Sequence, residues 1–126
     1  MLADTDALAT IPVKTLASAR KFYEETLGLR PEGGDSQPSV ATYRSGKSKI
    51  LVYESEFAGT NKATAATWIV GNEIDAIVKR LQSKGATFEH YDMPDLELRG
   101  DIHVNGDMKV AWVRDPDGNI LSFVNG

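Results

Sequence analysis

The 126-residue chain contains no cysteine, which excludes disulfide bonds and thiolate metal sites and is typical of a cytoplasmic protein. It has no apolar run near the roughly 18 residues of a membrane-spanning helix, so no membrane partner is expected. Its first residues, MLADTDALAT, lack the basic stretch of a signal peptide. No basic stripe stands out and the formal net charge is −4, so nucleic acid is not an expected partner either.

The motifs of several enzyme classes are also missing. There is no GxGxxG sequence, no P-loop and no GxSxG elbow, so neither nucleotide binding nor a serine nucleophile is supported. The composition is close to that of typical globular proteins, with 41% hydrophobic and 25% charged residues. A chain of this length and composition is expected to fold as one domain with its own core.

The order of elements in the first half of the chain is repeated in the second. Residues 7–14 (ALATIPVK) predict a strand, and the pattern after them predicts a helix that ends at Gly28. Residues 65–71 (AATWIVG) predict a second strand, followed by a helix that ends at Gly85. Val70 lies 57 residues after Val13, and Gly85 lies 57 residues after Gly28. This constant offset indicates an internal repeat.

A second match between the halves covers a predicted strand-turn-strand hairpin. VATYRSGKSKILVYE (40–54) aligns without a gap on VAWVRDPDGNILSFV (110–124), at an offset of 70. The five identities are Val40/Val110, Ala41/Ala111, Arg44/Arg114, Ile50/Ile120 and Leu51/Leu121. SGKS and DPDG supply the turns. The offset grows from 57 to 70 because the second half contains an additional segment, interpreted here as a loop at 93–107.

Each half therefore predicts the order strand, helix, strand, hairpin, which is a βαβββ module of the α+β class. Module one is expected at about residues 5–56 and module two at about 64–126. One helix on four strands leaves a sheet face uncovered, so a single module is not expected to be stable alone. Two copies can arrange their sheets around a shared concavity.

The chain resembles the vicinal oxygen chelate superfamily of glyoxalases, bleomycin-resistance proteins and extradiol dioxygenases. The stretches that carry the resemblance are IPVKTLASARKFYEETLGL, IDAIVKRLQSKGATFE and DPDGNILSF. It implies a single α+β domain over residues 1–126, in which two βαβββ modules form a cup-shaped mixed sheet with the helices outside. It also implies a homodimer. The cup-shaped sheet has open edges, and a second subunit could protect them.

In the metal-using members, the resemblance implies a His or Gln on the first strand of a module and a Glu on its last strand. The Glu follows the DPDG turn, where this chain has Ser122. The ungapped repeat places Val52 at the equivalent position of module one. The first-strand positions fall near Leu8 and at Ala65 or Ala66. None of these residues is a good ligand for a divalent cation, so no metal and no cofactor are expected.

Strand alternation suggests which side chains face the cup. If Ser122 faces it, then Leu121 and Phe123 point to the helix side. The expected ligand-binding residues are Thr42, Val52, Glu54, Trp112 and Ser122. Trp112 can stack on a planar group, although it can equally fill core.

Acid–base candidates are few. Glu54 could act as a general base if it is buried, or it could be solvated at its strand end. His90, at the expected end of the sixth strand, could act as an acid or base or make an exposed hydrogen bond. His103 is placed in the additional loop. Residues 95–105, with Tyr91 and Met93, could form a lid.

Three functions remain open at this point. The first is a small-molecule binding or sequestering protein of bleomycin-resistance type without the usual metal site. The second is a lyase or isomerase that uses Glu54 or His90, with or without an atypical metal. The third is an interaction domain in which the cup has lost its role. The sequence does not identify a ligand or substrate.

Overall fold

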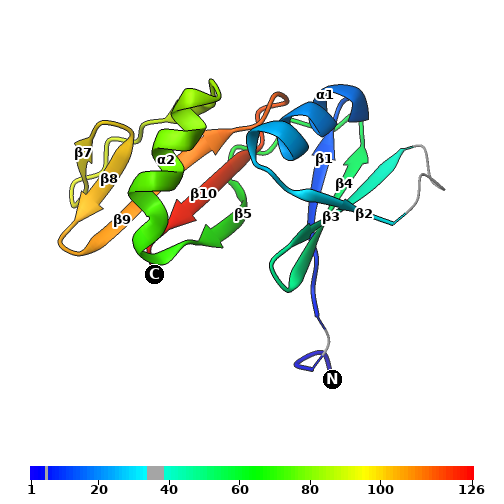
Figure 1. Cartoon of the computed structure of the whole chain (residues 1–126), viewed down its shortest axis with the longest axis horizontal. Coiled ribbons are helices and arrows are strands. Elements are labelled where there is room, and N and C mark those ends of the chain that lie inside the picture. Colours follow the sequence, from blue (N-terminus) through cyan, green and yellow to red (C-terminus); the bar gives the residue numbers. More distant parts are fainter. Residues whose placement is uncertain (5, 34–38) are drawn as a thin grey trace. The chain divides into compact units, whose positions relative to one another are not determined.

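The computed structural model describes residues 1–4, 6–33 and 39–126, and the chain divides into two compact units. Unit one comprises residues 1–60 and unit two residues 61–126 (Figure 1). Each unit follows the βαβββ order, with an additional hairpin in unit two, so the predicted α+β class is confirmed. No helix in the described residues is long and apolar enough to span a membrane.

Unit one is a four-stranded sheet with a helix on one face. Its elements are β1 (Ala9–Val13), α1 (Leu16–Arg20), the π-helical segment η1 (Lys21–Thr26), β2 (Arg30–Glu32), β3 (Val40–Ser45) and β4 (Ser48–Glu54). The strand order is β1-β4-β3-β2, with β1 parallel to β4 and the other pairs antiparallel.

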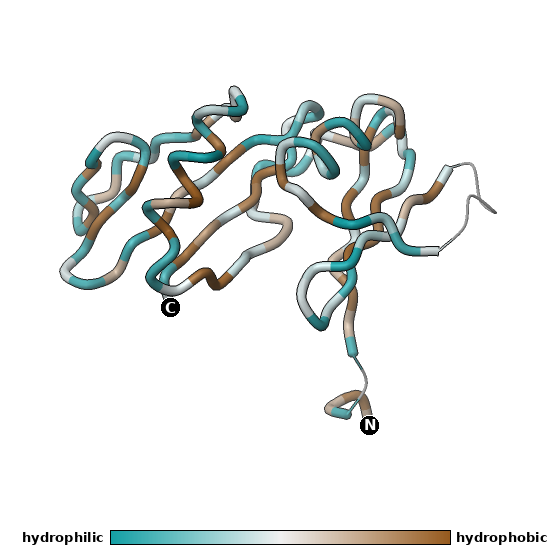
Figure 2. Tube along the Cα trace, in the orientation of Figure 1, coloured by the Kyte–Doolittle hydropathy of each residue, from teal (hydrophilic) through white to brown (hydrophobic). Residues whose placement is uncertain are grey.

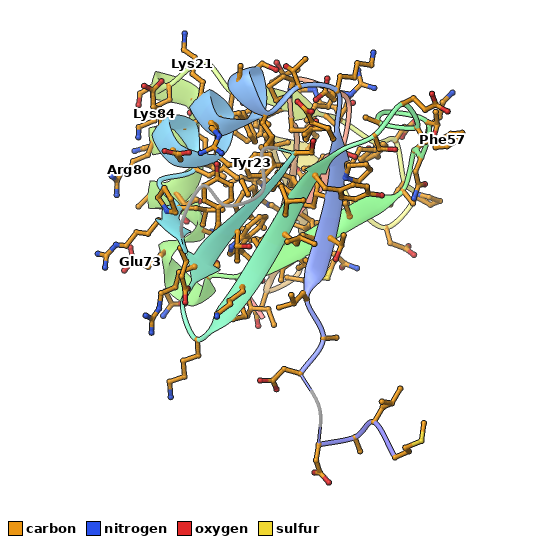
Figure 3. The ribbon with its side chains drawn as sticks, turned by 90° about the vertical axis from the view of Figure 1, so that its right-hand side faces the viewer. Lys21, Tyr23, Phe57, Glu73, Arg80 and Lys84 are labelled. Carbon is orange, nitrogen blue, oxygen red and sulfur yellow. The ribbon has the colours of Figure 1, made fainter. Side chains whose placement is uncertain are left out.

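The helix of unit one buries one face against the sheet. Ala19 and Tyr23 are buried, and the Tyr23 ring stacks on Tyr43 of β3 with 6.1 Å between the ring centroids. In Figure 3 the Tyr23 side chain points from the helix toward the strands, whereas Lys21 points away. The helix ends at Gly28, whose φ of +72° lies in the left-handed region that favours glycine. The buried face of this sheet is therefore the face that α1 and η1 cover.

Unit two repeats this plan around a longer helix. Its elements are β5 (Thr64–Ile69), the 3₁₀ turn η2 (Gly71–Glu73), α2 (Ile74–Ser83), β6 (Thr87–Glu89), β7 (Glu97–Arg99), β8 (Ile102–Asn105), β9 (Met108–Arg114) and β10 (Ile120–Val124). The sheet order is β5-β10-β9-β8-β7, and β6 also pairs with β9.

The amphipathic pattern of α2 positions it on the sheet. Ile74 and Val78 are buried and pack against Ala111 of β9. Hydrophobic and hydrophilic residues alternate along α2 in Figure 2, as expected of a helix with one face on a sheet. The predicted helix with its stop at Gly85, where φ is +77°, is confirmed.

The segment 93–107 is not the loop that the sequence suggested. It contains the β7–β8 hairpin, and β8 pairs with the first half of β9 while β6 pairs with the second half. The hairpin thus widens the sheet, and the expected lid at 95–105 is wrong. His103 is accordingly a buried strand residue. The short strands escape detection because three or four residues carry too little periodicity.

Candidate functional site

In unit two, three polar or aromatic residues lie side by side on the face opposite α2. Ser122 of β10 pairs with Trp112 of β9 on one side and with Thr67 of β5 on the other. Paired residues share a face, and Ala111, next to Trp112, packs under α2. Trp112, Ser122 and Thr67 therefore project away from the helix, which agrees with the face expected for Trp112 and Ser122.

The hydroxyl groups in this row are bonded to each other. Thr67 Oγ1 and Ser122 Oγ lie 2.6 Å apart, and either can be the donor. Ser122 is buried and Thr67 is exposed. One hydroxyl hydrogen is used in this bond, so the pair keeps a second donor and free acceptor positions for another group.

Trp112 belongs to an aromatic cluster on the same face. The His103 ring meets it edge to face with 4.8 Å between centroids, and the Tyr91 ring does so at 4.9 Å. Trp112 is half-buried. Its ring is thus held in one orientation by two neighbours while part of it stays accessible.

His103 ties this cluster to the chain that follows β6. The backbone N–H of Tyr91 donates to His103 Nε2 at 2.9 Å, which places the proton of the neutral ring on Nδ1. His103 is fully buried, and burial lowers the pKa of its imidazole; nearby His90 acts in the same direction and the Val110 carbonyl opposes it. The hydrogen bond into Nε2 and the lowered pKa both favour the neutral ring. Sequence reasoning missed this residue because it assigned His103 to a loop.

In unit one the strand register contradicts the ungapped alignment of the two hairpins. Thr42 pairs with Leu51, whereas Ala41 pairs with Val52. Thr42 and Val52 consequently lie on opposite faces of the sheet and cannot both face the cup. Val52 is fully buried on the helix side with Tyr43. The assignment of Val52 to the ligand-binding face is wrong.

The source of this error is one residue in the hairpin. Thr42 aligns with Trp112, but Trp112 pairs with Ser122 and Thr42 pairs with Leu51, so the last strands are shifted by one position relative to the ungapped alignment. A one-residue slip moves every side chain of a strand to the other face. Leu51, not Val52, is the counterpart of Ser122.

Glu54 shares the face of Val52 and has a structural partner there. Its Oε2 accepts a hydrogen bond from the backbone N–H of Leu16 at 2.9 Å, and Leu16 is the first residue of α1. A carboxylate at a helix N-terminus satisfies an unpaired N–H and interacts favourably with the helix dipole. The expected place of Glu54 in the cup, as a ligand contact or general base, is therefore wrong.

The strand register identifies the first-strand residue that stands directly opposite the last-strand position. For Ser122 this residue is Thr67, because Ala66 pairs with Leu121 and Ala65 falls in the register irregularity between them. Ala66 therefore lies on the helix side of the sheet with Leu121.

In unit one the same rule selects Thr10, which pairs with Leu51. Leu8 precedes β1 and is 47% exposed. Thr10 and Thr67 are separated by the same interval as Gly28 and Gly85. That interval was available in the sequence and could have located both threonines.

The residues directly opposite each other on the first and last strands are thus Thr10 and Leu51 in unit one and Thr67 and Ser122 in unit two, and the first-strand positions that the resemblance implies hold Leu8 and Ala65 or Ala66. These side chains offer hydroxyl and alkyl groups but no carboxylate or imidazole, so they do not fit the ligand set of a divalent metal. Within the described ranges, no group of three or more His, Cys, Asp or Glu residues is placed to hold a metal ion.

His90 makes an exposed hydrogen bond, and its ring also lies edge to face on that of His103 with 6.2 Å between the centroids. Its Nε2 lies 2.6 Å from Oδ1 of Asp101, and Gln82 Nε2 donates to Oδ2 of the same carboxylate at 2.8 Å. These bonds, that of Gln82 first, lower the pKa of Asp101. Asp101 lies at the turn between β7 and β8. The hydrogen bond from Gln82 therefore connects this hairpin to α2.

Comparison with known proteins places this geometry in a family. The family model described as Glyoxalase/Bleomycin resistance protein/Dioxygenase superfamily matches residues 6–123. No curated protein sequence matches the chain.

Solved structures of the same fold cover nearly the whole chain. A glyoxalase/bleomycin resistance protein/dioxygenase from Alicyclobacillus acidocaldarius is 20% identical, with a TM-score of 0.72 over 98% of this chain and 93% of its own. The fosfomycin resistance protein FosX from Listeria monocytogenes is 15% identical, with a TM-score of 0.71 over 100% and 93%. A lactoylglutathione lyase from Agrobacterium tumefaciens is 13% identical, with a TM-score of 0.67 over 95% and 92%.

Proposed function

Because the chain belongs to the Glyoxalase/Bleomycin resistance protein/Dioxygenase superfamily, we propose that it binds or sequesters a small molecule without the metal site that other members use. The observation that carries this proposal is the hydroxyl pair of Thr67 and Ser122 at paired register positions. Polarisation of vicinal oxygens by a metal requires ligands that this pair does not supply. Binding needs only a shaped surface with a few polar groups.

The row beside that pair supplies such a surface. Trp112 is half-buried and fixed by Tyr91 and His103, so its ring can stack on a planar group with little loss of side-chain entropy. The hydroxyls of Thr67 and Ser122 can hydrogen-bond a polar edge of the same ligand. In unit one, Thr42 occupies the equivalent place on its own sheet and is proposed as a ligand contact of that sheet by itself. Names of relatives that denote drug resistance are in keeping with a binding role.

A ligand screen that reads Trp112 fluorescence tests the proposal. Planar drug-like molecules are titrated into wild-type protein, Trp112→Phe, Trp112→Leu and Trp68→Phe, with affinities measured in parallel by calorimetry. We expect the fluorescence change to persist in Trp68→Phe and to vanish in Trp112→Phe. In Trp112→Leu, which removes the aromatic face, the calorimetric affinity should fall about tenfold, the loss of one stacking contact. Trp68 is the matched control because it stacks on Phe123, on the helix side of the sheet.

The same samples distinguish binding from catalysis. Recovery of each ligand after prolonged incubation should show it chemically unchanged. Turnover that is lost in His90→Gln would overturn the proposal and favour the lyase or isomerase. Unchanged calorimetric affinity in Trp112→Leu would remove Trp112 from the site.

We also propose that the protein is a cytoplasmic homodimer. Large hydrophobic side chains stand exposed on both units, among them Phe57 at 68% and Ile69 at 76%, and Figure 3 shows Phe57 projecting from the loop after β4. Burial of such side chains favours association. Sedimentation equilibrium should give twice the mass of one chain, and Ile69→Ser should weaken the dimer. A monomeric wild type at micromolar concentration would contradict this proposal.

A further inference from the structure

Three basic side chains form a row across neighbouring strands of unit one. Arg30 of β2 pairs with Arg44 of β3, and Arg44 pairs with Lys49 of β4. Paired residues on neighbouring strands share a face and stand about 5 Å apart. All three residues are exposed, and the row lies on the face of Thr42, away from α1.

Only one acid in the described residues neutralises this row. Glu32 Oε1 lies 3.1 Å from Lys49 Nζ. Arg44 donates through Nε to the Gly46 carbonyl at 3.4 Å, which is not an ion pair. The side chain of Arg30 makes no hydrogen bond or ion pair with the part of the chain that the structure describes. Three cations and one acid leave a local charge of +2 on a chain whose formal net charge is −4.

The equivalent row of unit two provides an internal comparison. There Thr87 pairs with Arg114, and Arg114 pairs with Ile120. Glu89 is the counterpart of Glu32, because it lies 57 residues further along, the offset of the internal repeat. It forms an ion pair with Arg114. One cation and one acid are thus balanced in unit two, whereas unit one has two further cations at the positions of Thr87 and Ile120. The excess is specific to unit one rather than a property of the fold.

Like charges placed directly opposite each other destabilise a sheet, and an anion that bridges them removes the cost. We propose that Arg30 and Arg44, with Lys49 beside them, bind the anionic group of a small molecule, of the phosphate or carboxylate type. Guanidinium groups suit this role because their paired N–H donors match the oxygens of such anions. The site lies on unit one alone, so it stands whether or not Trp112 of unit two binds a ligand.

Inorganic phosphate is the probe, and amide chemical shifts of the full chain are the readout, because they report weak binding residue by residue. Phosphate is titrated at constant ionic strength against sodium chloride, and acetate is titrated separately to distinguish phosphate from carboxylate recognition. We expect saturable shifts at Arg30, Arg44 and Lys49. Arg30→Gln and Arg44→Gln should each weaken phosphate binding about tenfold, the effect of one charge-assisted hydrogen bond.

Arg114→Gln is the matched control, because it removes the equivalent arginine of unit two, which already has an acid partner. It should leave phosphate affinity unchanged. The proposal is overturned if chloride produces the same shifts, if phosphate shifts do not saturate, or if Arg30→Gln and Arg44→Gln retain wild-type affinity. Saturation by acetate but not by phosphate would assign the site to carboxylates.

Discussion

Thr67 and Ser122 stand opposite each other on β5 and β10, with their hydroxyl oxygens 2.6 Å apart. In metal-using relatives, the resemblance places a carboxylate at the position of Ser122. Here the two side chains bond to each other instead. The pair satisfies part of its own hydrogen-bonding capacity, which fits a site that contacts a ligand directly.

This pair predicts the metal content. After incubation with Ni, Zn, Mn and Fe(II) and removal of free metal, we expect mass spectrometry to find no stoichiometric ion in the wild-type chain. The double variant Thr67→His/Ser122→Glu supplies an imidazole and a carboxylate on one face and should retain more Zn than wild type. Close to one metal per wild-type chain, lost in Ser122→Ala, would contradict this expectation.

The register of β4 predicts different costs for neighbouring serine substitutions. Val52→Ser opens a gap in the helix-side core and buries a hydroxyl group, so it should lower the free energy of unfolding by about 3 kcal/mol. Leu51→Ser affects the half-buried face and should cost about 1 kcal/mol. Urea denaturation measures both. Equal costs, or a greater cost at Leu51, would show that the faces are assigned wrongly.

The contact of Glu54 with α1 predicts a modest loss of stability without loss of binding. Glu54→Gln removes the charge from the helix N-terminus and should lower the free energy of unfolding by about 0.3–1 kcal/mol. The control is Glu56→Gln, two residues further along and exposed. Ligand affinity should be unchanged in both variants, whereas a large loss of affinity in Glu54→Gln alone would restore Glu54 to the site.

The buried imidazole of His103 predicts a stability that falls on acidification. Burial lowers its folded-state pKa below the unfolded value of 6.5, so below pH 6.5 the unfolded chain takes up a proton that the folded chain does not. The folded state therefore loses stability as the pH falls from 6.5 toward the folded pKa, and regains it as the pH rises.

Urea denaturation between pH 5.5 and 7.5 checks this expectation. The pH slope of wild type should shrink in His103→Gln, because glutamine does not titrate and its side-chain oxygen can accept the Tyr91 N–H. His90→Gln is the control and should keep most of the slope, since it leaves the buried His103 in place. An undiminished slope in His103→Gln would assign the pH dependence to other groups.

The large features of the fold could be predicted because they depend on long patterns. The apolar stripe of α2 and the two hairpins extend over enough residues for their periodicity to be recognised, and the glycines at 28 and 85 mark where the helices stop. Such patterns give the order of the elements and the helix-side core. Alternation also sorts the side chains of each strand into two faces, and in unit two the face expected for Trp112 and Ser122 agrees with their pairing.

The register between strands could not be read in the same way. An ungapped alignment cannot reveal that two hairpins differ by one residue, and this single residue moved Val52 and Glu54 to the wrong face. His103 was misplaced for a different reason: its strand owes its existence to pairing with β9 rather than to its own sequence. Local sequence propensity reveals neither the register difference between the hairpins nor the formation of β8.

The bond between Tyr91 and His103 also affects hydrogen exchange. Tyr91 lies two residues beyond the end of β6, where an amide would ordinarily exchange with solvent like that of any loop. Its proton is instead held by a ring nitrogen that stops accepting hydrogen bonds once it is protonated. Protection of the Tyr91 amide against exchange should therefore fall when His103 is protonated. The exchange rate of this backbone amide thus reports the protonation state of a buried side chain.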